Sequence, residues 1–279
     1  MRVSTTQFAL DPVVNNEEFW ERIERLVGEA ARDKSQLILL PEYFSLSWLL
    51  YRICGDHFRA NLLRANELIP EFQRRMQTFA DRYDMTIVAG TVPVTDQDKI
   101  YNRCYVFQTG IAPIYQDKIN MTRFENEEWQ VSSGGFSLKT FRVGEFLCAV
   151  TTCYDVEFPA VTALAAQSRV DLLLVPSCTD DVHGYWRVRH CAQARTIENQ
   201  CYVMMSSIVG GNKPWSEIDI HYGQGGIYTP CDVGMPEGGV KKLGLINVEG
   251  VITEELSHAD LERLRKNGTV LNLRDSSQR

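Results

Sequence analysis

A cysteine stands at the point where a predicted β-strand gives way to a predicted helix. The apolar run Phe146 to Val150 has the composition of a strand, and Cys153 follows it, ahead of an alanine-rich helical run at 160–168. A thiol on a turn between a strand and a helix is presented for nucleophilic attack. Free cysteines are also among the most buried residues of proteins, so this position taken alone favours a structural thiol.

Two further residues have the chemistry that a cysteine nucleophile needs. Glu42 comes directly after the apolar run Leu37 to Leu40 and a proline, at the end of a predicted buried strand. Apolar surroundings raise the pKa of a carboxyl group toward that of a general base. Lys118 follows the strand-like run Pro113 to Tyr115 and offers a fixed positive charge to a developing oxyanion. Taken singly, each is more typical of a solvent-exposed loop.

Together these three residues resemble the catalytic set of the nitrilase (carbon–nitrogen hydrolase) superfamily. Their order along the chain and their separations fall in the range of that family. The resemblance covers essentially the whole chain. It extends to Gln7, Pro41-Glu42-Tyr43-Phe44, Ala89-Gly90-Thr91, Trp186-Arg187 and the helical segment Ala194 to Asn199.

The resemblance implies a role for each residue. Cys153 would be the nucleophile and Glu42 the general base. Lys118, together with the backbone N–H after Cys153, would hold the oxyanion. This chemistry needs no metal or organic cofactor, and none is expected.

The family usually has a second glutamate between the lysine and the cysteine. The acidic segment Phe124 to Trp129 supplies three candidates for it. Counting back from Gly134 makes Glu127 the best match, and Glu125 and Glu128 remain alternatives. A carboxylate at this place would anchor the lysine ammonium and bias proton transfer.

The expected activity is hydrolysis of a non-peptide C–N bond in a small molecule. An amide or carbamoyl substrate would form a thioester on Cys153 and release ammonia or an amine, and water would then release the carboxylic acid. A nitrile substrate is compatible with the same triad. The non-enzymatic alternative is a binding protein that keeps the fold without turnover.

Four residues beside the catalytic ones are expected to contact substrate: Tyr43, Tyr154, Glu157 and Thr179. The two tyrosines have a competing role as core residues, which is the commoner fate of aromatic side chains. Asp180 and Asp181 would either bind a cationic group or cap the helix predicted at 185–199. The cap is the expected role.

Composition narrows the class of protein. The 279 residues are 44% hydrophobic and 23% charged, as in ordinary globular proteins, and no linker or repeat divides a single domain spanning 1–279. The net charge of −7, without a basic stripe, argues against nucleic-acid binding. No run approaches the roughly 18 apolar residues of a membrane span. The N-terminus reads as a strand without a signal peptide, so a cytoplasmic location is expected. The eight cysteines lack disulfide or zinc-type spacing.

Strand–helix alternation mixed with hairpins predicts an α/β fold with mixed sheets and helices on the outer faces. The resemblance adds a four-layer αββα sandwich and homodimers formed through the helices after Cys153 and the tail at 255–279. Irregular stretches at 210–226 and 230–239 are expected to line a site. Strands are predicted at 2–10, 36–40, 86–91, 102–108, 110–115, 136–142, 145–150, 172–176, 201–208, 225–228 and 244–247. Helices are predicted at 15–32, 70–82, 160–168, 185–199 and 255–265, followed by an extended end.

Overall fold

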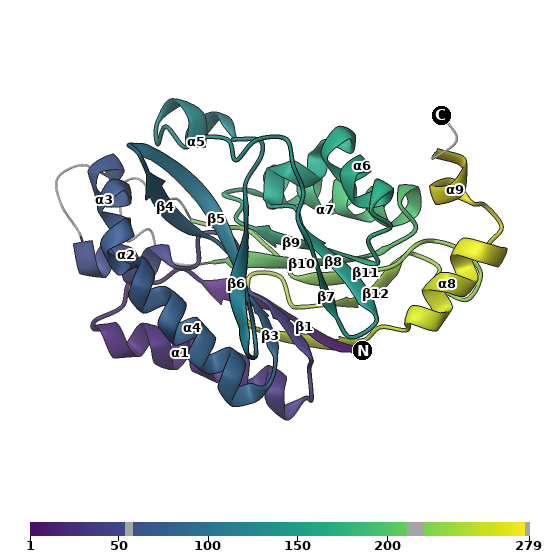
Figure 1. Cartoon of the computed structure of the whole chain (residues 1–279), viewed down its shortest axis with the longest axis horizontal. Helices are drawn as coiled ribbons and strands as arrows, with labels where there is room; N and C mark the ends of the chain where they lie inside the picture. The colour runs from purple at the N-terminus through teal and green to yellow at the C-terminus, as the bar shows by residue number, and fades with distance from the viewer. Residues whose placement is uncertain (54–57, 211–219, 277–279) are drawn as a thin grey trace.

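The computed structural model describes residues 1–53, 58–210 and 220–276 (Figure 1). Its strands are β1 (Arg2–Ala9), β2 (Leu37–Leu39), β3 (Thr86–Val88), β4 (Val92–Asp96), β5 (Lys99–Gln108), β6 (Ile111–Asp117), β7 (Thr140–Val143), β8 (Phe146–Val150), β9 (Leu172–Ser177), β10 (Tyr202–Val209), β11 (Gly226–Tyr228), β12 (Val240–Leu243) and β13 (Gly250–Glu255). Its helices are α1 (Asn16–Arg32), α2 (Leu46–Ile53), α3 (Phe58–Arg64), α4 (Ile69–Tyr83), α5 (Arg123–Glu127), α6 (Pro159–Gln167), α7 (Val182–Glu198), α8 (His258–Asn267) and α9 (Asn272–Ser276), with 3₁₀ turns η1 (Ala65–Leu68) and η2 (Cys153–Glu157).

The described strands form one sheet with two packed halves. The main path is β4-β5-β3-β2-β1-β10-β9-β8-β7, with β6, β11, β12 and β13 attached beside it. Side chains from both halves meet in one inner core: Leu37 and Leu39 of β2 share it with Leu172 and Leu174 of β9. The sheet therefore curls until its halves face each other.

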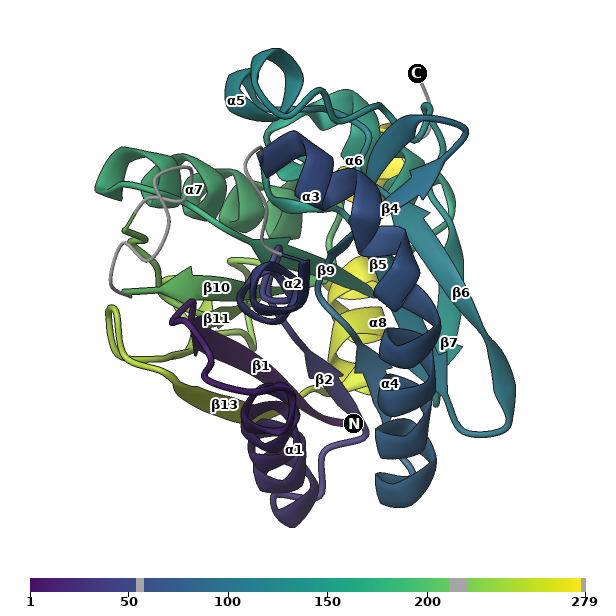
Figure 2. The same ribbon diagram turned by 90° about the vertical axis from the view of Figure 1, so that its left-hand side faces the viewer.

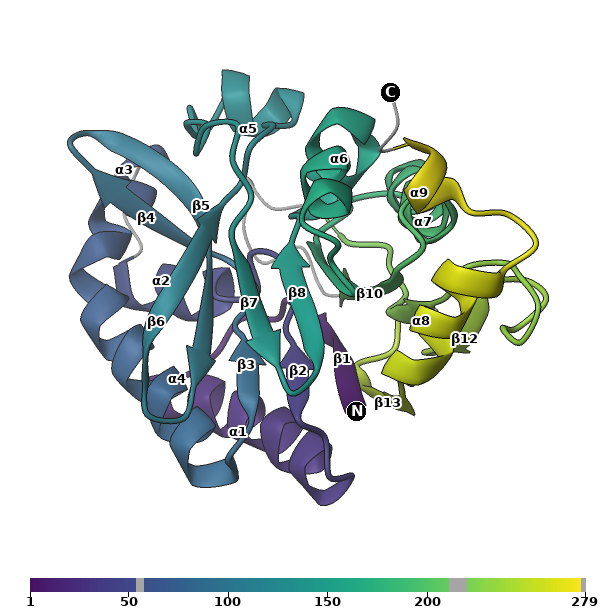
Figure 3. The ribbon, with the colours of Figure 1, turned by 45° about the vertical axis from the view of Figure 1, so that its right-hand side comes forward.

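Helices cover both outer faces and complete the αββα sandwich. The outer core on one side joins α1, α2 and α4 to the near half of the sheet, and these helices face the viewer in Figure 2. The core on the other side joins α6 and α7 to β8, β9 and β10 (Figure 3). Ile38 of β2 faces the first helical layer while its neighbours face the inner core. This confirms the prediction of a strand buried on both faces.

Helix α1 shows how sequence signals set the element boundaries. The Asn15 side chain accepts a hydrogen bond from the backbone N–H of Glu18 at 2.8 Å and so caps the helix. Phe19, Ile23 and Val27 recur at helical spacing and are buried against the sheet. The helix predicted at 15–32 is confirmed.

The sheet topology brings three chain segments to one edge. Strands β2, β1, β10, β9 and β8 run parallel to one another. Strand β6 pairs antiparallel with β5, which pairs antiparallel with β3, so β6 points the same way as β2. The carboxyl ends of β2, β6 and β8 therefore lie at the same edge, where open α/β sheets form their sites.

Several predicted elements differ from the structure. Helices α2 and α3 lie where none was predicted, and 244–247 is irregular between β12 and β13. The strand predicted at 86–91 ends at Val88 because Gly90 turns with φ +49°, where an added Cβ would lie 2.0 Å from the backbone oxygen of Pro41. Residues 211–219 of the irregular stretch predicted to line a site lie outside the described residues.

The C-terminal segment packs on its own domain. Arg265 of α8 donates to the carbonyl oxygens of Val170 and Gln200 at 2.7 and 2.9 Å and pairs with the Asp171 carboxylate. The end predicted to be extended forms α9 instead, with the Leu273 N–H bonded to the Gln200 side chain. Within the described ranges, no helix is long and apolar enough to span a membrane.

Candidate active site

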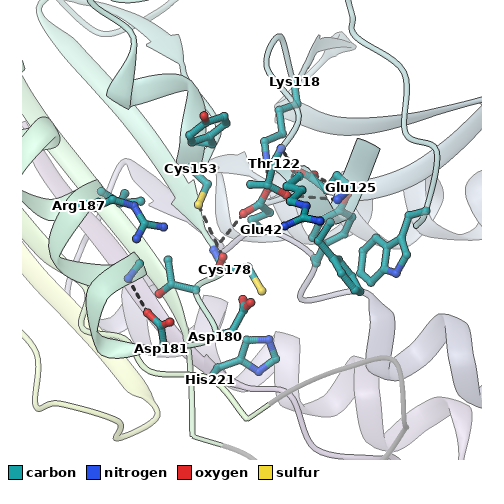
Figure 4. Close-up of a pocket in the computed structure, with 18 of the residues that line it drawn as sticks. Glu42, Lys118, Thr122, Glu125, Cys153, Cys178, Asp180, Asp181, Arg187 and His221 are labelled. Carbon is teal, nitrogen blue, oxygen red and sulfur yellow. Dashed lines mark hydrogen bonds and ion pairs between the residues drawn. The ribbon is translucent and has the colours of Figure 1, made fainter. Parts of the chain in front are cut away.

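Cys153 begins the 3₁₀ turn η2, directly beyond strand β8. Its φ of +46° lies in the left-handed region, which is uncommon for a residue with a side chain. The side chain lines a pocket although the residue is only 4% exposed, and Sγ lies 3.6 Å from the carbonyl oxygen of Cys178. The turn therefore holds the thiol in one place at the strand end (Figure 4).

Lys118 is a fully buried cation between two carboxylates. Its Nζ lies 2.8 Å from Glu42 Oε1 and 2.6 Å from Glu125 Oε2, and the residue is 1% exposed. Burial lowers the pKa of an amine, but the two carboxylates outweigh this and hold the pKa of Lys118 well above its ordinary value. The ammonium is therefore a permanent positive charge at the sheet edge.

Glu42 has the environment of a general base. Its carboxylate accepts hydrogen bonds from Lys118, from Asn102 Nδ2 at 2.9 Å and from the backbone N–H of Cys178 at 3.0 Å. Burial raises the pKa of Glu42 to about 7, against the lowering effect of Lys118. The neighbouring Cys153 thiol also lowers the pKa of Glu42. The carboxyl group can therefore exchange a proton near neutrality.

The carboxylate on the far side of Lys118 belongs to Glu125, so the expectation of Glu127 is wrong. Glu125 is the third residue of the short helix α5, where its side chain and that of Thr122 form a capping box. It also accepts from Tyr43 Oη at 2.8 Å. Burial raises the pKa of Glu125, but Lys118 together with the hydrogen bonds from Thr122 and Tyr43 holds the pKa below its ordinary value, so the group stays ionised.

Helix geometry explains the difference. Residues two apart lie on opposite sides of a helix, so Glu127 points outward and pairs with Arg123 at 2.8 Å. Glu128 is also exposed. The Thr122-x-x-Glu125 spacing is a capping-box pattern, and it was the signal in the sequence that distinguishes Glu125 from its neighbours.

A pocket of about 310 Å³ opens over these groups (Figure 4). All four residues expected to contact substrate line it: Tyr43, Tyr154, Glu157 and Thr179. Asp181 caps α7, as expected, by accepting from the Gly184 N–H at 2.7 Å. Arg187 of α7 lies at the same mouth, 3.8 Å from Glu157.

Comparison with known families decides the class of protein. The carbon–nitrogen hydrolase family model matches residues 2–266. This chain belongs to the carbon–nitrogen hydrolase family. The match spans both halves of the sheet and all of the site residues described in this section.

Relatives of this carbon–nitrogen hydrolase include named amidases. A probable hydrolase of Bacillus subtilis, YhcX, is 30% identical over 275 residues, which are 99% of this chain but 53% of that protein. The chain thus spans about half the length of that relative. Omega-amidase NIT2 of Xenopus tropicalis is 26% identical over 78% of this chain and 82% of its own.

Solved structures show the same fold. Saccharomyces cerevisiae Nit3, a member of the nitrilase superfamily, superposes with a TM-score of 0.77 at 22% identity, over 95% of this chain and 93% of that one. A variant of an amidase from Nesterenkonia sp. AN1, in complex with butyramide, gives 0.75 at 19% identity, over 94% and 96%. The nitrilase-type sandwich expected from the sequence is confirmed.

Some groups of this hydrolase site were missed at the level of sequence. Asn102 bonds to both Glu42 and Glu125, at 2.9 and 3.0 Å, from the middle of β5. Cys178 contributes its backbone N–H and carbonyl oxygen from the end of β9. The only signal for Asn102 was a weak one, an asparagine within a strand predicted to be buried. The Cys178 contacts come from its backbone, so no side-chain pattern predicts them.

The carbon–nitrogen hydrolase has one grouping of possible metal ligands among its described residues. Asp171, His258 and Glu262 lie together near α8, and the pocket does not include them. Arg265 pairs with both Asp171 and Glu262, so its guanidinium already supplies the positive charge there. In the pocket, the Lys118 ammonium is paired with the Glu42 and Glu125 carboxylates.

Proposed function

We propose that this carbon–nitrogen hydrolase cleaves the amide or carbamoyl C–N bond of a small molecule through a thioester on Cys153. The observation that carries the proposal is the buried Lys118 ammonium, paired with Glu42 and Glu125 beside a thiol in one pocket. The named amidases among its relatives support this class of substrate.

The first half-reaction forms the thioester. Glu42 takes the proton of the Cys153 thiol as the sulfur attacks the carbonyl carbon, because burial keeps that thiol's pKa well above its ordinary value. The carbonyl electron pair moves to oxygen. Glu42 then gives its proton to the substrate nitrogen, the C–N bond breaks, and ammonia or an amine leaves.

Lys118 has a donor left for the oxyanion. An ammonium group carries three N–H donors, and among the described residues two of them go to Glu42 and Glu125. The third, with the backbone N–H of Tyr154, stabilises the negative oxygen of the tetrahedral intermediate. Glu125 holds the ammonium in place throughout, and Asn102 holds the Glu42 carboxylate.

The second half-reaction returns the enzyme to its starting state. Glu42 accepts a proton from water, and the hydroxide attacks the thioester carbon. The C–S bond breaks, the acid leaves, and the thiolate recovers its proton. No step in this scheme consumes an oxidant or a second substrate besides water.

The decisive test is Cys153→Ala with a panel of ω-amides, carbamoyl amino acids, short aliphatic amides and nitriles. Wild-type protein should release ammonia from at least one amide with a pre-steady-state burst, and the variant should release none. Mass spectrometry of quenched wild-type reactions should detect an acyl group on Cys153. Hydrolysis that survives Cys153→Ala contradicts the thioester mechanism.

We also propose that residues 1–279 act as a single catalytic domain that pairs into a homodimer in the cytoplasm. Exposed apolar side chains on α7, namely Val182, Trp186 and Ile197, support pairing through the helices after the nucleophile. Sedimentation equilibrium should give twice the chain mass. A Trp186→Glu variant should shift the equilibrium toward monomer, and monomeric wild-type protein would contradict the proposal. Cell fractionation tests the location.

A further inference from the structure

The charged groups of the pocket outside the catalytic set are mainly acidic. Among the described residues these groups are Arg123, Glu157, Asp180, Asp181 and Arg187. Arg123 is 87% exposed at its side chain and pairs with Glu127 outside the pocket. Of the remaining side chains, Glu157, Asp180 and Asp181 are acidic, Arg187 is basic and His221 also lines the pocket, and a lining with more carboxylates than basic groups concentrates cations.

Two of those carboxylates, Glu157 and Asp181, already interact with the charge of Arg187. Its Nε lies 3.8 Å from Glu157 Oε1. Its charge also helps to hold the pKa of Asp181 below the usual range, after the larger effect of the Gly184 N–H. A substrate carboxylate placed at Arg187 would meet both acids. The arginine is thus a poor receptor for an anionic substrate.

Glu157 is the acid nearest the interior. Its side chain is 17% exposed, and its ion pair with Arg187 is longer than a hydrogen bond. Burial raises the pKa of its carboxyl group above the ordinary value, against the effect of Arg187 and Lys118. A substrate that displaces water from this carboxylate must supply N–H donors in return, because an unpaired buried charge is costly.

Glu157 also lies at a useful distance from the nucleophile. It ends the 3₁₀ turn that Cys153 begins. A 3₁₀ turn rises about 2 Å per residue, so the two Cα atoms are about 8 Å apart. A small molecule bound at Cys153 can therefore place a group a few bonds from its carbonyl beside Glu157.

We propose that Glu157 is a specificity-determining residue that selects amides carrying a protonated amine a few bonds from the scissile carbonyl. This inference rests on the proposed amide hydrolysis. The ammonium would lie between Glu157 and the carboxylates at the pocket mouth. An amide with a carboxylate at the same place would be disfavoured.

Three amides of matched shape test the selectivity: γ-aminobutyramide with a terminal ammonium, valeramide with a methyl group, and glutaramate with a carboxylate. We expect kcat/KM for ammonia release to be about tenfold higher for γ-aminobutyramide than for valeramide, and lowest for glutaramate. A preference for glutaramate overturns the proposal. Better hydrolysis of glutamine than of γ-aminobutyramide also overturns it, because Arg187 would then bind carboxylate.

The variant Glu157→Gln assigns the selectivity to one residue. It should raise KM for γ-aminobutyramide about tenfold with kcat nearly unchanged, since the ion pair forms equally in the ground state, and so remove most of the preference for γ-aminobutyramide over valeramide. Glu237→Gln removes the same charge from an exposed loop outside the pocket and should change neither. Equal effects of the two variants would overturn the role of Glu157.

Two further measurements test the ammonium preference without a Glu157 variant that could misfold and, in the second case, without turnover. In wild-type protein, KM for γ-aminobutyramide should rise with ionic strength while that for valeramide stays constant. Calorimetric binding of the three amides to Cys153→Ala should show the same order of affinity. If no amide is hydrolysed by the wild type, the proposed function fails, and the binding order still confirms or overturns the ammonium preference.

Discussion

Asp155 holds Asn120 through both its backbone and its side chain. Asp155 Oδ1 accepts from the Asn120 backbone N–H at 2.7 Å and from Nδ2 at 3.2 Å, while Oδ2 accepts from the Ile119 N–H at 3.1 Å. Asp155 lies two residues after Cys153, and Asn120 lies two residues after Lys118. One buried carboxylate therefore ties the turn that carries the thiol to the segment that carries the ammonium.

Asp155→Asn should weaken this connection. An amide has only one oxygen acceptor, so one or more of the three hydrogen bonds is lost and the free energy of unfolding should fall by about 1–3 kcal/mol. A small displacement of Lys118 relative to Cys153 should also lower kcat about 100-fold. Thermal melting and steady-state kinetics measure the two effects. The exposed Asp96→Asn serves as control, and wild-type kcat in Asp155→Asn would contradict a positioning role.

Glu125→Gln and Glu127→Gln form a matched pair on one helix. The first removes a charge 2.6 Å from Lys118 and should lower kcat by roughly two orders of magnitude. The second removes an exposed partner of Arg123. It should leave kcat as in wild type and the free energy of unfolding within about 0.5 kcal/mol of the wild-type value. Similar losses in both variants would contradict the placement of Glu125 at the ammonium.

Lys118→Met should destabilise the protein in a pH-dependent way. The change leaves Glu42 and Glu125 buried without their cation, which costs about 3–5 kcal/mol at neutral pH. Both carboxyl groups would then have folded-state pKa values above their unfolded ones, so stability is lost as pH rises through the neutral range. Urea unfolding at acid and neutral pH tests this. A deficit that grows toward acid pH would show the opposite sign.

The ionisation of Glu42 should control the reactivity of the thiol. Since burial raises the pKa of Glu42 to about 7, kcat/KM should rise with pH and level off above that value. Alkylation of Cys153 by iodoacetamide should follow the same curve without substrate. In Glu42→Gln the inflection should vanish and alkylation at neutral pH should slow at least tenfold. A reaction rate that keeps rising beyond pH 9 would assign control to the thiol alone.

The sequence contained enough to predict the sandwich and the three residues that meet at the centre of its pocket. Each of Glu42, Lys118 and Cys153 follows a strand whose carboxyl end lies at the same sheet edge, and strand ends are visible in a sequence because apolar runs stop there. That the three side chains come together at this edge was predicted from the family motif.

Other features depend on tertiary contacts that spacing does not record. Glu125 and Glu127 differ only in which side of a five-residue helix they occupy. Asn102 acquires its role because β5 passes beside two carboxylates. Helix α9 forms where an extended end was predicted because Leu273 finds a partner in Gln200, far away in the chain. These outcomes depend on how separate elements pack against each other. The sequence of one element alone does not determine that packing.

The left-handed backbone at Cys153 sets stability against activity. Glycine adopts this φ without strain, whereas other residues lose about 1 kcal/mol or more. Cys153→Gly should therefore melt at a higher temperature than Cys153→Ala, although neither variant is expected to hydrolyse an amide. Among variants that have lost Cys153, selection for heat resistance alone would then favour glycine, so directed evolution of this protein should assay turnover together with thermal survival.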